Sequence, residues 1–236
     1  QRECGGHVQH LVDGGAARLG DATAESILAC DEGAADRLAK FTGLSVREPS
    51  SMEVLSEMGL ESVFMPDPTL LLTGDDWSAL ASDDGLDTIP QSYVLLYTLN
   101  SEQKLVDRAR KIASELGVPV VCIHYNTKKF PGMINVRGIG PAAFLKLVSE
   151  ASFVCTDSFH GACFSMNFNK SFVVKTSDSA VQSNVRITDL LARYGIEGCL
   201  YRDEVVTSAV DYGHANQTLS HDRDTARAFI ARCIGL

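Results

Sequence analysis

The sequence predicts an α/β protein whose main domain is a Rossmann-like parallel sheet with helices on both faces. Three observations lead to this prediction. Short apolar segments of strand length recur in the second half of the chain, segments with helical spacing separate them, and glycine or proline marks many junctions. Continuously apolar strands are typical of parallel sheets, because helices bury both faces of such a sheet. The 236 residues suffice for one large domain, or for one domain and part of another.

The first part of the chain carries the weaker signal, and residues 1–40 show little periodicity. The elements expected after them are, in order, a strand in 40–48, a helix over 50–58 that ends at Gly59, and a strand over 62–65 that ends before Pro66. The polar, acidic stretch 82–85 is the candidate linker. We therefore expect a partial N-terminal α/β domain at residues 1–85 and a C-terminal Rossmann-like domain at residues 86–236.

The second part of the chain alternates strands with helices, as a parallel sheet requires. Strands are expected at 93–97, 118–123, 153–156 and 172–175. Helices are expected at 103–116, 141–150, 189–194 and 222–234.

The acidic composition excludes some classes of function. The net charge is −9, whereas proteins that bind nucleic acid or an anionic membrane surface need a basic face. No apolar run approaches the ~20 residues that a transmembrane helix needs, and the N-terminal residues show no signal-peptide core. We therefore expect a soluble, cytoplasmic protein with no transmembrane segment and no nucleic-acid partner.

The seven cysteines lie far apart and include no C-x-x-C pair. Several have apolar neighbours, so we expect buried free thiols. His7 and His10 have a spacing that could place both on one helix face, but no carboxylate or cysteine partner is well placed nearby. We therefore expect no bound metal and no other cofactor.

The most informative segment is Thr156-Asp-Ser-Phe-His-Gly161, which follows a buried strand directly and precedes a helix. Ligands of open α/β sheets bind at the carboxyl ends of strands, and helix N-termini attract anions. His160 can exchange a proton near neutral pH, and Asp157 could orient its imidazole or make a turn bond. Ser158 could cap the helix or donate to a phosphate, and Gly161 permits close backbone approach. Position alone leaves a plain helix cap and a surface histidine open.

The same residues resemble the signature of the polysaccharide pyruvyl transferase family. The resemblance is carried by Thr156-Asp-Ser-Phe-His-Gly-Ala-Cys-Phe-Ser165 and by Phe168-Asn-Lys-Ser-Phe-Val173. Further segments agree with the family in order and spacing: Ser45-Val-Arg-Glu48, Asp67-Pro-Thr-Leu-Leu-Leu72 with Trp77, Gly140-Pro-Ala-Ala-Phe144, and Asn184-Val-Arg-Ile-Thr-Asp-Leu-Leu191. The resemblance runs from about Leu44 to the C-terminus.

The resemblance implies an enzyme that transfers a pyruvyl group from phosphoenolpyruvate to a hydroxyl pair of a saccharide or lipid-linked saccharide, forming a pyruvate ketal. It implies His160 as the acid/base residue, with Asp157 beside it as the second catalytic candidate. It also implies that the helix start, formed by Ser158, Phe159 and Gly161, holds the phosphate or carboxylate of the donor.

Three further residues are candidates for substrate binding. Arg47 matches the family's S-V-R-E segment and would bind an anion in bidentate fashion; an ion pair with Glu48 or another local acid is the alternative. Arg186 is a weaker anion-binding candidate, because an exposed arginine at a helix start is an equally good interpretation. His124 ends a predicted strand and could line the site.

The resemblance also implies a GT-B-type pair of Rossmann-like domains. The region before Ser45 is shorter than a complete first domain, so we expect the N-terminal domain to be short or incomplete. Two other functions remain open. A nucleotide-sugar-dependent GT-B glycosyltransferase could place a nucleotide phosphate at the same turn, and an inactive family member could act as a binding partner in glycan synthesis.

Overall fold

The computed structural model describes residues 23–124, 129–176, 181–203 and 209–235, and these residues form two compact units. Unit 1 takes in the described residues up to Asp67 together with those from Ser220 onward, and unit 2 comprises Pro68–Leu219.

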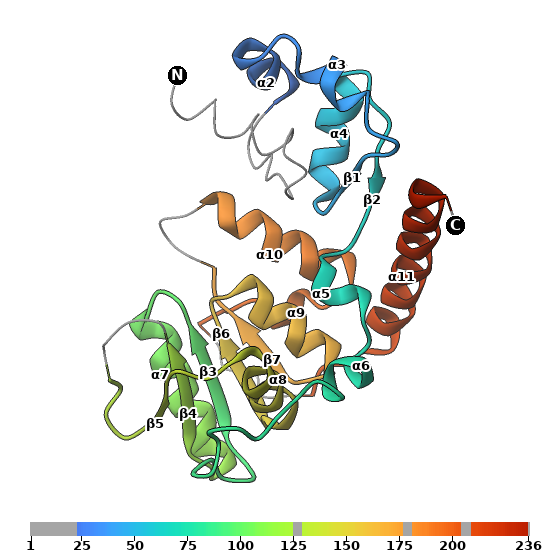
Figure 1. The fold of residues 1–236 in the computed structure, drawn as a ribbon. Helices are drawn as coiled ribbons and strands as arrows, with labels where there is room; N and C mark the ends of the chain where they lie inside the picture. The colour runs from blue at the N-terminus through green and yellow to red at the C-terminus, as the bar shows by residue number, and fades with distance from the viewer. Residues whose placement is uncertain (1–22, 125–128, 177–180, 204–208, 236) are drawn as a thin grey trace. The chain divides into compact units, whose positions relative to one another are not determined.

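Unit 2 is built around a five-stranded parallel sheet with the strand order β5-β4-β3-β6-β7 (Figure 1). Its strands are β3 (Val94–Thr98), β4 (Val120–His124), β5 (Ile134–Val136), β6 (Phe153–Thr156) and β7 (Phe172–Val174). The chain runs outward from β3 through β4 to β5, and then returns to the other side of β3 for β6 and β7. The order therefore reverses between β3 and β6. This reversal is a topological switch point, the place where open α/β sheets bind their ligands.

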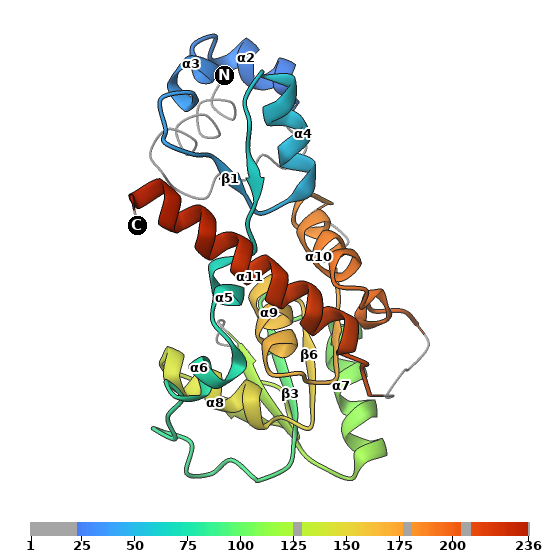
Figure 2. The ribbon, with the colours of Figure 1, turned by 90° about the vertical axis from the view of Figure 1, so that its right-hand side faces the viewer.

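Helices cover both faces of this sheet. The helices of unit 2 are α5 (Pro68–Leu71), α6 (Gly74–Ser78), α7 (Gln103–Leu116), α8 (Pro141–Glu150), α9 (Phe159–Asn167), α10 (Val181–Arg193), the 3-10 helix η1 (Glu197–Cys199) and the start of α11 (Gly213–Ile234); α5 packs on α9, and α6 packs on α8. Figures 1 and 2 show α7 on one side of the sheet and α8 and α9 on the other. Side chains alternate between the two faces of a strand, so Leu96 of β3 packs with the α7 side, and its neighbour Leu95 packs with the α8 and α9 side.

The helix α7 illustrates how the sequence forms these elements. Leu105, Ala109 and Ile112 recur at helical spacing and are fully buried against the sheet. Gly117 then ends the helix in the left-handed conformation with φ of 67°, which a residue without a Cβ adopts at little cost. The next strand, β4, begins three residues later at Val120.

Unit 1 has a smaller core. Its elements are α2 (Ala24–Cys30), α3 (Ala34–Leu38), β1 (Ser45–Val46), α4 (Pro49–Glu57), β2 (Val63–Phe64) and the last part of α11. The strands β1 and β2 pair in parallel, with Ser45 opposite Val63 and Val46 opposite Phe64. The buried residues of its core are Ala24, Ile27, Ala34, Leu38, Leu55 and Met58.

The structure confirms the α/β class and the parallel sheet flanked by helices. Helices 103–116 and 141–150 and strand 153–156 have the predicted bounds. Other predictions were too short: α10 begins at Val181 and α11 begins at Gly213, well before the residues predicted for them. The strand β5 and the helices α2 and α3 were not predicted from the sequence.

Residues 68–85 lie in unit 2, whereas the N-terminal domain expected from the sequence extended to residue 85. Leu70 is fully buried in the core of unit 2. The Trp77 indole donates to the Thr69 carbonyl (2.8 Å) and packs edge-to-face on Phe164 of α9. These contacts anchor the segment to α9, and no local sequence pattern would reveal them. The residues from Ser220 onward, assigned to the C-terminal domain, belong to unit 1.

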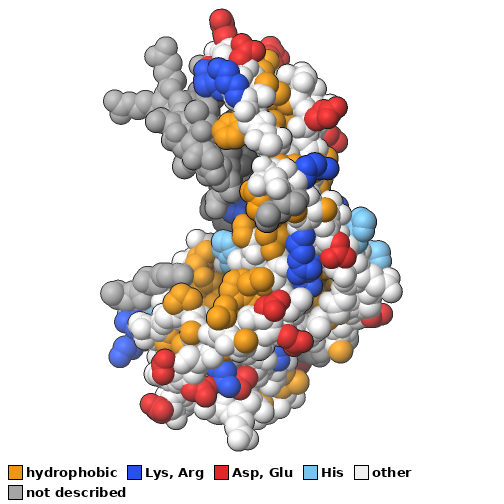
Figure 3. All heavy atoms as spheres, turned by 45° about the vertical axis from the view of Figure 1, so that its right-hand side comes forward, with side chains coloured by type: hydrophobic (Ala, Val, Ile, Leu, Met, Phe, Trp, Pro, Cys, Tyr) orange, Lys and Arg blue, Asp and Glu red, His pale blue; other side chains and the backbone are white. Residues whose placement is uncertain are grey.

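The surface carries charges of both signs. On the face shown in Figure 3, acidic and basic side chains are interspersed, and hydrophobic side chains lie between them. Within the described ranges, no helix has both the length and the apolar character that crossing a membrane requires.

Candidate functional site

The signature segment lies at the switch point of the unit 2 sheet. Thr156, the last residue of β6, pairs in parallel register with Tyr97 of β3. Asp157 and Ser158 then lead into α9, so they leave the carboxyl end of β6 beside the carboxyl end of β3. The fold therefore places the predicted site residues 157–161 where a ligand of this sheet would bind.

Ser158 is the N-cap of α9. Its hydroxyl accepts a hydrogen bond from the Gly161 amide (3.3 Å), and its own amide donates to Thr156 Oγ1 (3.0 Å). A helix cap and a phosphate contact were the two roles that the sequence left open for Ser158. A serine hydroxyl that accepts one hydrogen bond keeps its proton for donation, so the observed cap is compatible with both.

His160 is exposed in the first turn of α9. Its ring lies edge-to-face with the buried Phe159 ring, with 5.6 Å between centroids and 76° between planes. The guanidinium carbon of Arg186, on α10, lies 5.3 Å from the centroid of the same Phe159 ring. An arginine placed over an aromatic ring makes a favourable cation–π contact. The fold therefore brings Arg186 and His160 against the same phenylalanine ring, although they belong to different helices.

Asp157 is buried and turned toward β3. Its Oδ2 accepts from the Thr98 hydroxyl (2.9 Å) and from the Asn100 amide (3.0 Å), and its Oδ1 accepts from the Leu99 amide (2.7 Å). The sequence left two roles open for Asp157, orienting the His160 imidazole or bonding to a turn. The structure contains the bonds to the turn. The carboxylate spans the switch point and joins the end of β6 to the turn that follows β3.

His124 ends β4, where it pairs with Thr98 of β3. The residue is 6 % exposed, and its ring packs edge-to-face on Phe130 at 5.3 Å and has Nε2 3.3 Å from Asn135 Oδ1. His124 thus lies at the predicted edge of the sheet, but its side chain is buried there.

Arg47 lies in unit 1 and is held by two carboxylates. Its Nη1 donates to Asp67 Oδ2 (2.7 Å), and its Nε and Nη2 donate to Glu48 Oε1 (3.0 and 2.9 Å). Burial by itself would lower the pKa of Arg47, but the hydrogen bonds and charges of Asp67 and Glu48 outweigh burial and raise it. Arg47 therefore makes the local ion pairs that were the alternative to substrate binding. A substrate anion would have to compete with both carboxylates for the guanidinium.

Two polar residues at the ends of strands, Thr98 of β3 and Lys175 after β7, were not predicted as site residues from the sequence. Thr98 donates to Asp157 and accepts from the Ser101 amide (2.9 Å). After β7, the buried Lys175 ammonium lies 2.5 Å from Glu102 Oε2 and donates to the Thr176 carbonyl (2.9 Å). In the sequence these two residues are marked only by their position at the end of an apolar stretch. That position becomes informative only when the strand order is known.

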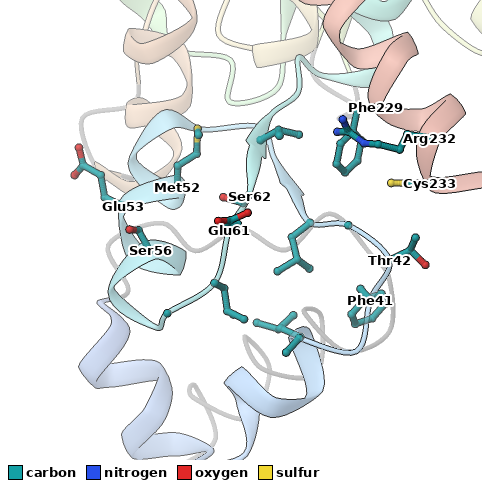
Figure 4. A pocket seen from close by; sticks show the side chains of 17 residues that line it. Phe41, Thr42, Met52, Glu53, Ser56, Glu61, Ser62, Phe229, Arg232 and Cys233 are labelled. Carbon is teal, nitrogen blue, oxygen red and sulfur yellow. The ribbon is translucent and has the colours of Figure 1, made fainter.

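Unit 1 contains a separate cavity of about 1010 Å³ (Figure 4). It lies among the segment 38–63 and the end of α11, with Phe41, Met52, Phe229 and Arg232 among its lining residues. None of the predicted site residues lines this cavity. Among the residues that the structure describes, no group of three or more His, Cys, Asp and Glu side chains is arranged to hold a metal ion.

Comparison with models of protein families matches residues 29–179 to polysaccharide pyruvyl transferase. The matched region includes Arg47 and the whole signature and ends before Arg186. The candidacy of Arg186 as a site residue therefore rests on its position over Phe159 and on the resemblance. No individual curated protein matches the sequence. Because the family match covers more than half of the chain, with the signature at the switch point of an α/β sheet, the chain belongs to the polysaccharide pyruvyl transferase family, a family of transferases that act on saccharides.

Proposed function

We propose that this protein transfers the pyruvyl group of phosphoenolpyruvate to two hydroxyls of one saccharide unit, free or lipid-linked, and forms a cyclic ketal. The observation that supports this most strongly is that His160 and Arg186 both contact the Phe159 ring, at the switch point of the sheet. This pairing offers a proton-exchanging group and a permanent cation within one site.

The donor is a small dianion or trianion, and two features of this site suit it. The nine-residue helix α9 directs the positive end of its dipole toward the end of β6. The guanidinium of Arg186 adds a permanent positive charge, and its N–H groups can bind two oxygens of a carboxylate or phosphate. The phosphate and carboxylate of the donor would therefore lie between the first turn of α9 and Arg186.

The chemistry moves two protons, one to carbon and one to phosphate. The methylene carbon of phosphoenolpyruvate gains a proton and becomes a methyl group, while the first sugar oxygen attacks C2 and loses its proton. The bond from C2 to the phosphate oxygen then breaks and phosphate leaves with the electron pair, while the second hydroxyl attacks C2 and its proton passes to the departing phosphate. An exposed imidazole can carry protons between these atoms, and we assign this role to His160.

Donor binding can be tested by the thermal midpoint of the protein with phosphoenolpyruvate, and with a UDP-sugar as the comparison. A ligand that binds only the folded protein stabilises it by ~2.7 kcal/mol at one hundred times its Kd. We expect phosphoenolpyruvate to raise the midpoint, the Arg186→Met variant to lose most of that shift, and Arg110→Met to keep it. Arg110 is a matched control because it lies on α7, on the opposite face of the sheet, and its side chain is 44 % exposed.

A midpoint raised only by the UDP-sugar would instead support a nucleotide-sugar glycosyltransferase. Release of inorganic phosphate from phosphoenolpyruvate, dependent on an added saccharide, would complete the test. Retention of the full phosphoenolpyruvate shift in Arg186→Met would remove Arg186 from the donor site.

A further inference from the structure

A short turn leaves the carboxyl end of β3 on the other side of the switch point from α9. It comprises Leu99, Asn100 and Ser101, between β3 and α7. Because β3 and β6 are neighbours in parallel register, this turn and the start of α9 emerge from the same edge of the sheet. Each therefore flanks the place where the sheet would bind its ligand.

The backbone of this turn is fixed by hydrogen bonds. Its three consecutive amides all donate inward: Leu99 and Asn100 to the Asp157 carboxylate (2.7 and 3.0 Å), and Ser101 to Thr98 Oγ1 (2.9 Å). Ser101 has φ of 55°, a sparsely populated conformation for a residue with a Cβ. Such conformations persist only where the surroundings hold them in place, so the hydrogen bonds to Asp157 and Thr98 preorganise this turn.

Two side chains of the turn, those of Leu99 and Asn100, are exposed to solvent. Leu99 is 44 % exposed, and Asn100 is exposed beside it. Within the part of the chain that the structure describes, the only hydrogen bond that Asn100 makes through its own polar groups is the inward one of its backbone amide. A rigid backbone therefore presents one apolar side chain and one carboxamide at the edge of the sheet.

We infer that the Leu99–Ser101 turn is the acceptor-binding wall of the site, and that Leu99 and Asn100 contact the saccharide. A pyranose has an apolar C–H face and a rim of hydroxyls. An aliphatic side chain covers the first, and a carboxamide both donates to and accepts from the second. Asp157 and Thr98 are positioning residues for this wall. The inference rests on the proposed function only for the identity of the acceptor as a saccharide.

The test compares Leu99→Ala and Asn100→Ala with the matched variant Leu116→Ala. Leu116 is 45 % exposed, but it ends α7 at the opposite edge of the sheet. We expect Leu99→Ala to raise the KM for the saccharide on the order of 10-fold, the effect of losing about 50 Å² of apolar contact. We expect Asn100→Ala to raise it roughly 3- to 10-fold through one lost hydrogen bond. The KM for phosphoenolpyruvate and the thermal midpoint stay unchanged, and Leu116→Ala matches wild type.

A binding experiment separates this inference from the proposed function. Saturation-transfer NMR with a panel of methyl glucosides, galactosides, mannosides and their N-acetylated forms reports saccharide contact without turnover. Signals that weaken in Leu99→Ala and Asn100→Ala but not in Leu116→Ala support the wall, even if phosphoenolpyruvate is never consumed. Equal signals in all variants, or none from any glycoside with wild type, would overturn it. Absence of phosphate release alone would count only against the proposed function.

The positioning role of Asp157 has its own readout. In Asp157→Asn a single oxygen remains to accept hydrogen bonds, so the Leu99 and Asn100 amides cannot both keep their partners. We expect their hydrogen exchange to accelerate about 10-fold or more, as local opening becomes easier, and the saccharide KM to rise with it. Unchanged exchange at both amides would show that Asp157 does not position the turn.

Discussion

The single residues of the site differ in exposure: an exposed side chain can meet a substrate, whereas buried side chains hold the backbone in place. His160 faces solvent at the start of α9, whereas Asp157 and Ser158 are buried and bond to the backbone around them. A buried side chain that holds the backbone affects stability when it is replaced, because its partners lose their hydrogen bonds. An exposed side chain such as His160 can be removed at little cost to the fold, so its replacement reports directly on chemistry.

Replacing His160 with alanine should therefore abolish turnover and leave the fold intact. We expect kcat to fall roughly 100- to 10,000-fold, the usual contribution of a general acid or base, with a thermal midpoint close to that of wild type. Phosphate release and thermal denaturation measure the two quantities. His214→Ala is the matched control, because His214 is likewise exposed and is the second residue of its helix, α11. Wild-type turnover in His160→Ala would refute the acid/base assignment.

Replacing Arg47 tests whether this residue stabilises unit 1 or binds the donor. Its partner Asp67 is only 3 % exposed, and removal of one member of a buried pair leaves an uncompensated charge. We expect Arg47→Met to lower the free energy of unfolding by about 3 kcal/mol, and we expect addition of Asp67→Asn to restore much of it. Denaturant titration of the three proteins measures this.

Arg110→Met is the control for that measurement, since its exposed pair with Asp107 is worth less than ~1 kcal/mol. The donor role that the resemblance implies for Arg47 makes a separate prediction. It requires the KM for phosphoenolpyruvate to rise in the stable Arg47→Met/Asp67→Asn protein, and an unchanged KM would exclude Arg47 from the site.

Among the elements, the contact of α9 with the ends of β3 and β6 decides where the signature lies. A Cβ added to Gly161 would collide with Thr156 Oγ1 and lie 3.0 Å from Tyr97 Cδ1. Glycine at this position therefore lets the first turn of α9 sit directly on the strand ends. Its requirement is space, because its φ is not in the left-handed region.

Gly161→Ala should consequently push α9 away from the sheet. We expect a loss of roughly 1–3 kcal/mol in stability from overpacking, together with reduced turnover, because His160 belongs to the same turn. Gly140→Ala provides the comparison: Gly140 is the N-cap of α8, and an added Cβ would meet nothing within 4 Å. Equal stability and activity of the two variants would show that the close packing of α9 is not required.

Most of the elements of unit 2 could be predicted because their sequence patterns are strong. The helix α7 has a full apolar face and a terminal glycine, and β6 is apolar throughout. The strand β5 was missed because it has three residues, one of them the polar Asn135, whose carboxamide bonds to the Phe130 and Met133 carbonyls. The helix α2 was missed because it is short and depends on a capping box between Thr23 and Ser26.

For the molecule as a whole, burial of thiols couples stability to alkaline pH. The five cysteines whose side chains are described are free, and four of them are buried, as the sequence predicted. Burial raises the pKa of Cys122 and of Cys199 from their ordinary value of 9.0 to about 12. Burial also raises the pKa of Cys155, Tyr93 and Tyr212.

These groups ionise in the unfolded chain before they ionise in the folded protein. The contribution of the thiols to stability is therefore complete below pH 9 and is lost as the pH rises toward 12, and that of the tyrosines is complete below pH 10 and is lost above it. We expect Cys122, Cys155 and Cys199 each to contribute a loss of about 1.4 kcal/mol per pH unit above 9. Denaturant unfolding at pH 8, 9.5 and 10.5 under reducing conditions measures the slope. Cys122→Ala should flatten this slope relative to wild type, and an unchanged slope would contradict the assignment.

By itself, the sequence determined the α/β class, most strands and helices of unit 2, the signature at the end of a buried strand, and the family. These features are local, because periodicity, turn residues and motif spacing are written in consecutive residues. Only the tertiary structure decided the strand order, and with it the switch point between β3 and β6. It also decided that Arg186 lies over Phe159, that Asp157 bonds to the turn after β3, and that Arg47 is held by Asp67 and Glu48. Such contacts join residues that are distant along the chain, and packing of the whole sheet selects among many pairings that the local sequence allows.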